Sequence, residues 1–221
     1  MATELLHALA RKAASAPEPE GTGRYHYIHT RGVHLRINHY LRRSGENTIT
    51  GSVEPYERHD WVAADGSGRI LMTKEGQPVQ PSGDYGPGEL AAQLFVTATD
   101  EDTLAAELTR FSSKTTTSAV MKAFEQVWHL QVVTPALQHL LLLHLAKCEG
   151  LSAEGTTVTH LDEERHRRKF LEFSPDTGML LTAEEHALEG ASLPISVPAV
   201  VSTTAWLYTG YRETTTPPAG R

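Results

Sequence analysis

The chain has 221 residues, which is enough for one large hydrophobic core or two small ones. Its formal net charge of -7 argues against nucleic acid as a partner, because phosphate binding requires a basic surface. Only one cysteine is present, so an intramolecular disulfide and a thiolate metal cluster are both excluded.

The N-terminal segment predicts a helix followed by a linker. Leucines at positions 5, 6 and 9 recur at helical spacing, which indicates a short amphipathic helix over residues 1–15. The stretch APEPEGTG at 16–23 cannot continue this helix, because proline and glycine both interrupt helical backbone. We therefore expect a linker that leads into the first strand.

Residues 24–88 have the composition of β-strands. Aromatic and β-branched residues are frequent in YHYIHTRGVHLRI, in NTITGSVEPYERHDWV and in GRILMTKE. The tract AADGSG at 63–68 is typical of a hairpin turn. The segment 76–88 contains three prolines and four glycines, so we expect a loop there.

Residues 89–149 change to helical periodicity. Helices are predicted in GELAAQLFVTA, TDEDTLAAELTRF, TTTSAVMKAFEQVWHL and TPALQHLLLLHLAKCEG. Thr99 is the expected N-cap of the second, because acidic residues follow it where the helix dipole favours them. Thr134 and Pro135 are typical of a helix start, and Gly150 of a helix end. The most apolar run, at 140–146, is too short to cross a bilayer.

Residues 150–213 return to strand composition. Strands are predicted in GTTVTHL, RRKFLEF, GMLLTAEEHAL and VVSTTAWLYTGYRE, and SPDTG at 174–178 predicts a turn. Strands, a helical insert and further strands together predict one α+β domain over 24–213, with an antiparallel sheet of about 7–8 strands and the helices on one face. Residues 214–221 are expected to form a flexible tail.

Four histidines fall within RYHYIHTRGVHLRINHY at 24–40. In one continuous strand, side chains alternate between faces, and the histidines that share a face lie too far apart to bind one ion. A chain reversal at Arg31-Gly32 would instead bring His29 and His34 side by side as a two-histidine metal site. The alternative is a set of ordinary, half-exposed strand histidines.

A second candidate metal site lies in HLDEERH at 160–166. Its two histidines, His160 and His166, can approach each other across a loop and contribute to a weak zinc or calcium site. Their spacing differs from that of zinc-binding helices, and a solvated turn is the alternative. The overlapping basic run RHRRK at 165–169 follows three acids, so we expect its charge to be neutralised locally.

The sequence contains no motif of a catalytic nucleophile and no phosphate-binding loop, so it predicts no catalytic residue and no cofactor. Cys148, near the end of a predicted helix, is expected to be a packed or partly exposed free thiol. Four aromatic residues can line a surface that recognises a ligand or a protein partner, although core packing is the usual role of each one singly: Tyr56, Trp61, Tyr85 and Trp206.

The order of motifs along the chain resembles a largely uncharacterised actinobacterial family of extracytoplasmic domains. The motifs are, in order, YHYIHTRG, ERHDWVAADGSGRI, the Pro/Gly loop, the helical insert, FSPDTGMLL and VPAVVSTTAWLYTGYRE. The similarity covers about residues 4–213, and its most specific parts are Trp61–Gly68 and PDTG at 175–178. Family members are usually membrane-anchored and associated with extracytoplasmic-function sigma factors. The resemblance implies an extracytoplasmic location, with an anchor absent from the chain as given, which is expected to be soluble. It also implies a sheet that curves around the helices, loosely like a periplasmic half-barrel.

Three functions are consistent with these observations. The first is a non-enzymatic sensor or protein-interaction domain of a sigma-factor-associated membrane regulator, acting through its sheet face or the 76–88 loop. The second is a carrier that holds an apolar ligand between sheet and helices, in a cavity lined by leucine and valine. The third is an enzyme, which requires a cleft where at least two histidines lie within hydrogen-bond reach of each other or of an acid, from the set His26, His29, His34, His59 and His160. Twelve histidines also raise the hypothesis of a pH-responsive conformation.

Overall fold

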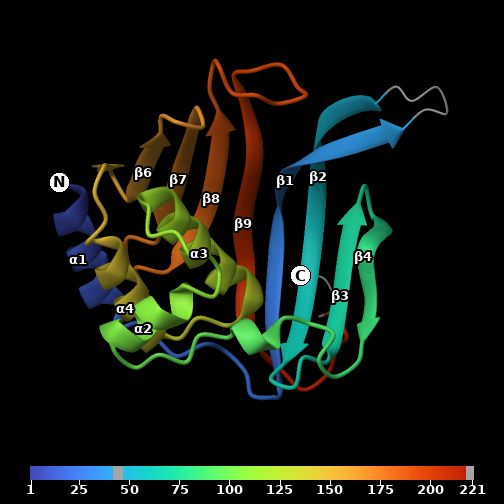
Figure 1. Ribbon diagram of the computed structural model, residues 1–221. Coiled ribbons are helices and arrows are strands. Elements are labelled where there is room, and N and C mark those ends of the chain that lie inside the picture. The colour runs from blue at the N-terminus through green and yellow to red at the C-terminus, as the bar shows by residue number, and fades with distance from the viewer. Residues whose placement is uncertain (42–46, 218–221) are drawn as a thin grey trace.

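The computed structural model describes residues 1–41 and 47–217, which form one open antiparallel β-sheet with helices on one face (Figure 1). Within these residues the sheet has nine strands, in the order β4-β3-β2-β1-β9-β8-β7-β6-β5. The first four strands are β1 (Tyr25–Leu41), β2 (Asn47–Ala63), β3 (Gly68–Lys74) and β4 (Gln77–Tyr85). The later strands are β5 (Leu151–Glu154), β6 (Thr157–Asp162), β7 (Arg167–Phe173), β8 (Leu180–Ala187) and β9 (Ala199–Arg212).

One helix begins the chain and the others lie between β4 and β5. They are α1 (Ala2–Ala13), the 3-10 turn η1 (Ala92–Leu94), α2 (Glu101–Leu108), α3 (Thr117–Leu130) and α4 (Pro135–Leu145). As predicted, Thr134 caps α4, and its hydroxyl accepts the Leu137 N–H at 3.3 Å. In the described residues, no helix has the length and apolar character that a membrane span requires.

The first strand, β1, lies at the centre of the sheet, and the strands after the helical insert begin at the edge opposite β4. Hairpins carry β1 to β4 outward to one edge, the helical insert crosses to the other edge, and β5 to β9 return toward the centre. There β9 pairs with β1, so strands from the two ends of the chain are neighbours. The predicted α+β fold, with an antiparallel sheet and a helical insert on one face, is confirmed.

The main core lies between the helices and the β5–β9 half of the sheet (Figure 1). Large apolar side chains of this core include Leu6, Leu9, Phe124, Trp128, Leu141, Leu142, Leu171, Phe173 and Trp206. Because α1 supplies two of them, the N-terminal helix belongs to the same core as the rest of the domain. The β1–β4 half extends beyond the helical layer, and there a smaller cluster packs Val62 and Ile70 under Leu90.

Two expectations for the middle of the chain are wrong. The segment 76–88, expected as a loop, contains the edge strand β4. Pro78 and Pro81 are compatible with this position, because an edge strand leaves part of its backbone unpaired. The predicted helix over 88–98 is only the short turn η1, and Asp100 rather than Thr99 caps α2 by accepting the Thr103 N–H at 2.8 Å.

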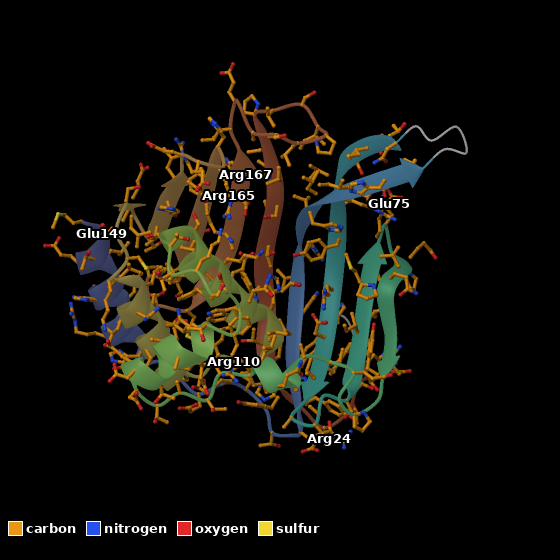
Figure 2. All side chains as sticks on the ribbon, viewed as in Figure 1. Arg24, Glu75, Arg110, Glu149, Arg165 and Arg167 are labelled. Carbon is orange, nitrogen blue, oxygen red and sulfur yellow. The ribbon has the colours of Figure 1, made fainter. Side chains whose placement is uncertain are left out.

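The basic run at 165–169 is neutralised locally, as predicted. Arg165 lies 3.5 Å from Asp162, and Arg167 lies 3.2 Å from Glu185. Figure 2 shows Arg165 and Arg167 close together at one end of the sheet. Lys169 bonds to Glu125 in the same way, so the arginines and lysine of this run, except for the exposed Arg168, are paired with neighbouring acids.

Candidate functional site

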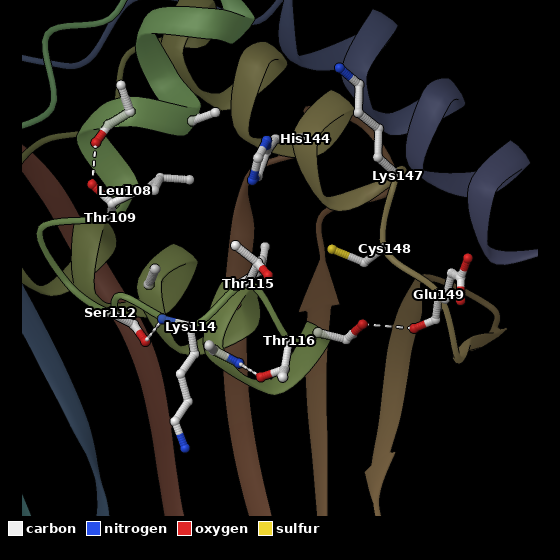
Figure 3. Close-up of a pocket in the computed structure, with 16 residues that line it drawn as sticks. Leu108, Thr109, Ser112, Lys114, Thr115, Thr116, His144, Lys147, Cys148 and Glu149 are labelled. Atoms are coloured by element: carbon white, nitrogen blue, oxygen red, sulfur yellow. Dashed lines mark hydrogen bonds between the residues drawn. The ribbon is translucent and has the colours of Figure 1, made fainter.

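A groove runs among α2, α3 and α4 on the helical side of the molecule (Figure 3). Its volume is about 710 Å³, within the range of pockets that hold small ligands. The space exists because α2 and α3 line it with alanines, where larger side chains would fill it: Ala105, Ala106, Ala119 and Ala123. Leu108 and Val120 complete an apolar floor.

The polar groups of the groove come from the ends of helices. The Thr117 hydroxyl donates to the Glu149 carbonyl at 2.8 Å, which ties the start of α3 to the segment after α4. Cys148 and His144 lie on the opposite wall, and both side chains turn toward the space in Figure 3. In the described part of the chain, the His144 ring has no hydrogen-bond partner and is free to meet a ligand.

The titratable groups on this wall favour their neutral forms. Burial raises the pKa of the Cys148 thiol, so the nucleophilic thiolate is disfavoured. Burial, and after it the charge of Lys147, lowers the pKa of His144, so its ring is uncharged at neutral pH. An apolar floor beside an uncharged thiol and imidazole is better suited to binding than to catalysis.

A second groove, of about 760 Å³, lies beside His26 and the loop before α4. Its polar groups already bond to one another: the Val132 N–H donates to His26 Nδ1 at 3.0 Å, and Gln131 exchanges two hydrogen bonds with the backbone of Val96. Burial lowers the pKa of His26 to about 4. We interpret this groove as a structural seam between the sheet and the loops, because His26 and Gln131 already bond to the backbone across it.

On the opposite face of the sheet, three side chains with metal-binding atoms converge. Ile28 packs in the helical core, so its neighbour His29 points to the other face, directly across from His59 on β2. The His29 Nε2–H donates to Glu57 Oε1 at 2.8 Å, and His59 Nε2 lies 3.9 Å from the same oxygen. One donor atom from each of the three residues lies within 4.8 Å of the others. We call His29, Glu57 and His59 the triad.

Aromatic rings surround the triad. The His29 and His59 rings stack at 4.0 Å between centroids, and the Tyr27 hydroxyl hydrogen-bonds to His59 Nδ1 at 2.9 Å. Tyr27 in turn stacks on Trp61 at 5.0 Å and contacts Tyr208 of β9 at 5.5 Å. Tyr27 and Trp61 are fully buried, although they lie on the face opposite the helices. The triad therefore rests on a rigid base.

The charges around the triad favour an ionised carboxylate beside a neutral imidazole. Burial alone raises the pKa of Glu57, but the hydrogen bond with His29 and the charge of Arg31 outweigh burial and lower it. Burial, and after it the charge of His29, lowers the pKa of His59. These are the protonation states that metal coordination requires.

The histidine pairs considered for metal binding are not brought together. β1 continues through Arg31-Gly32 without the reversal on which the pair depended, so His29 and His34 point to opposite faces. His160 lies in β6, with its Nδ1 3.2 Å from the Gly150 carbonyl. His166 lies instead in the turn after β6, where its ring packs against Gly190.

The four aromatic residues considered for recognition are divided between the two faces. Trp206 packs in the helical core, where its indole N–H donates to the Trp128 carbonyl at 3.0 Å. Tyr56 hydrogen-bonds to Thr204 at 2.9 Å, and Tyr85 packs in the smaller cluster under Leu90. Trp61 lies on the other face, so the four residues do not share one surface.

Neither Glu57 nor His59 was predicted as a metal ligand, although His59 is one of the histidines of the enzyme hypothesis. Their signal is present in PYERHDW, because residues two apart on a strand share a face. The third ligand depends on the register between β1 and β2, which pairs His29 with His59. No local motif specifies this register.

Comparisons with protein-family models, with curated proteins and with solved structures found no match to this chain. The resemblance to an actinobacterial extracytoplasmic family therefore stays a prediction. The functional inference rests on the geometry of the groove and of the triad.

Proposed function

We propose that the protein is a non-enzymatic sensor domain that binds a small apolar molecule in the groove among α2, α3 and α4. The supporting observation is the groove itself, with about 710 Å³ of space above an apolar floor. A ligand with an apolar body and one hydrogen-bonding head matches this lining. The body would lie over Leu108 and Val120, and the head would face His144.

This proposal joins the sensor hypothesis to the carrier hypothesis, with two differences from the expected site. The groove lies among helices rather than between helices and sheet, and alanine rather than leucine and valine makes most of its floor. The extracytoplasmic location, the membrane anchor and the association with a sigma factor are proposed on the resemblance alone. In that setting, a protein partner would receive the signal of ligand binding.

A binding role agrees better with the groove than an enzymatic one. The pKa of Cys148 is raised by burial, so the only thiol of the chain is a poor nucleophile. The triad on the other face meets the enzyme hypothesis only in part, since His29 lies within hydrogen-bond reach of Glu57 but His59 Nε2 is 3.9 Å from the same oxygen. Its atoms are nevertheless bonded to one another, and we assign it a binding role below.

Cys148 provides a reporter inside the groove, because the chain has no second cysteine. The test measures the reaction of this thiol with 5,5′-dithiobis(2-nitrobenzoate) in the presence of increasing decanoate. Decanoate has a flexible apolar body and a carboxylate head, and Lys114 is among the residues that line the groove. We expect decanoate to slow the reaction severalfold and saturably, because the bound chain covers the thiol.

Two matched variants locate the binding. Ala119→Phe fills the groove, so we expect slow labelling without decanoate and no further effect of decanoate. Ala136→Phe fills the second groove and is expected to leave the protection unchanged. A labelling rate that decanoate never alters, or protection lost in Ala136→Phe but kept in Ala119→Phe, contradicts the proposed site.

A further inference from the structure

We infer that the triad of His29, Glu57 and His59 binds one divalent transition-metal ion, with zinc the ion that its donors favour. This site goes beyond the proposed function, since it uses other residues on the opposite face of the sheet. In the described residues, it is the only group of three histidine, cysteine, aspartate or glutamate side chains whose donor atoms lie within 4.8 Å of one another.

The donor set is appropriate for zinc. Two imidazole nitrogens and one carboxylate oxygen form a common three-ligand zinc site, and water or a ligand takes the fourth position. The two strands bring the three ligands together. Glu57 and His59 are two residues apart on β2 and share a face, and His29 on β1 lies directly across from His59. Paired strands fix the three Cα positions, so the ligands are preorganised at the backbone level.

Binding requires side-chain movement but no change of register. The His29 and His59 rings are nearly parallel, at 17°. Because a metal ion lies in the plane of the imidazole that binds it, at least one ring must rotate to direct its Nε2 toward a shared ion. The Glu57 oxygen that now accepts from His29 then turns to the ion. A ring rotation is a small rearrangement for partly exposed side chains, which are 19% and 15% exposed for the two histidines.

Neighbouring residues hold the ligands in productive orientations. When His59 binds an ion through Nε2, its Nδ1 carries the proton and donates to the Tyr27 oxygen, 2.9 Å away. Arg31 Nη2 donates to Glu57 Oε2 at 3.3 Å and leaves Oε1 directed at the histidines. Tyr27 and Arg31 are therefore positioning residues for the site.

The triad also has a route to solvent. A surface groove of about 560 Å³ is lined by Glu57 and by Arg31, Val33 and Leu207. An ion can reach the carboxylate through this groove without any movement of the strands. The groove also leaves space for the water or ligand in the fourth position.

Among residues 1–41 and 47–217, other histidine–acid contacts lack a third donor and serve as controls. His186 lies 3.0 Å from Glu184 on β8, on the same face of the sheet, but has no second imidazole beside it. His129 lies 3.7 Å from Glu125, whose other oxygen is bonded to Lys169, so a cation already occupies that carboxylate. The comparison of His59 with His186 isolates the contribution of the triad from that of an ordinary pair.

The test titrates ZnCl2 into the Cys148→Ser variant at about pH 7.5, by isothermal calorimetry. Removal of the thiol leaves only imidazole and carboxylate donors. We expect saturation at one equivalent of zinc. His59→Ala and Glu57→Gln should weaken binding more than tenfold, whereas His186→Ala should not change it. Tyr27→Phe keeps all three ligands and is expected to weaken binding by about tenfold, because the His59 Nδ1–H loses the oxygen that accepts its proton.

A second readout keeps the result clear if an alanine variant unfolds. Glu57→Gln preserves the shape of the side chain, and its thermal unfolding is measured beside that of the parent. Co²⁺ replaces Zn²⁺ in parallel titrations, where visible absorption bands report coordination at low ligand number. No binding of either ion at millimolar concentration, or equal losses in His59→Ala and His186→Ala, overturns the inference. Decanoate protection of Cys148 is measured separately, so failure of one proposal does not imply failure of the other.

Discussion

On the helical face of the sheet, Glu125 of α3 bonds to Lys169 of β7, and the two side chains are only 14% and 12% exposed. On the opposite face, the pair of Glu184 and His186 is 42% and 32% exposed. The chemistry of the two pairs is similar, but their environments differ. Helices exclude water from the first pair, whereas solvent screens the second.

This difference indicates two roles for charged groups in the same sheet. On the helical face an ion pair is part of the folded core, because neither partner can be solvated if the other is lost. Burial alone raises the pKa of Glu125, but the bonds to His129 and Lys169 outweigh burial and lower it to about 2. On the opposite face, charged and imidazole groups remain accessible to an ion or a ligand, and the triad lies there.

The largest effect is expected from Glu125→Gln. The substitution leaves Lys169 buried without its counter-charge, so we expect the free energy of unfolding to fall by about 3 kcal/mol. Glu184→Gln, in the exposed pair, should change it by less than about 0.5 kcal/mol. Urea unfolding followed by circular dichroism measures both. Equal losses would contradict the distinction between the two faces.

The pH dependence of stability tests the same comparison with a smaller effect. Burial lowers the pKa of His26 from its ordinary value of 6.5 to about 4, while its Nδ1 accepts the Val132 N–H. Between these pH values the unfolded chain takes up a proton that the folded protein does not. Stability should therefore fall as the pH decreases from 6.5 to about 4, by about 1–2 kcal/mol after allowance for solvent screening.

His26→Asn provides the measurement for this assignment. The asparagine oxygen can accept from Val132 in place of Nδ1 but does not titrate, so the stability profile of the variant should be flatter than that of the parent. Urea unfolding at several pH values compares the two slopes. A slope that does not change in His26→Asn would assign the pH dependence to the other histidines.

The fold class was predictable because the capping residues, the helical periodicity and the strand composition all predicted the same elements. Thr134 and Pro135 begin α4 where the capping pattern placed its start, and strand composition located most of the sheet. Edge strand β4 was missed because its prolines and glycines are typical of loops. Tertiary context decides such a segment, since an edge position tolerates residues that a central strand does not.

The sites were less predictable, and for different reasons. The Glu57-x-His59 spacing is visible in the sequence, but the partner histidine follows from the pairing of β1 with β2. A shift of this register by two residues would place another side chain opposite His59. The groove depends on Ala105 of α2 and Ala119 of α3 lining the same space, and no periodicity within either helix encodes that packing.

Two tryptophans permit the finest comparison between the faces. Trp206, on the helical face, donates its indole N–H to the Trp128 carbonyl, whereas Trp61, on the opposite face, has no acceptor for this group among the described residues. Tryptophan-to-phenylalanine changes remove the same atoms at both buried positions. Trp206→Phe also leaves a buried carbonyl unpaired, so it should cost about 1 kcal/mol more than Trp61→Phe. Urea unfolding of the two variants checks the order. A larger loss of unfolding free energy for Trp61→Phe would mean that the opposite face is packed as tightly as the helical core. The difference between the faces that Glu125 and Glu184 show would then apply to charged groups alone.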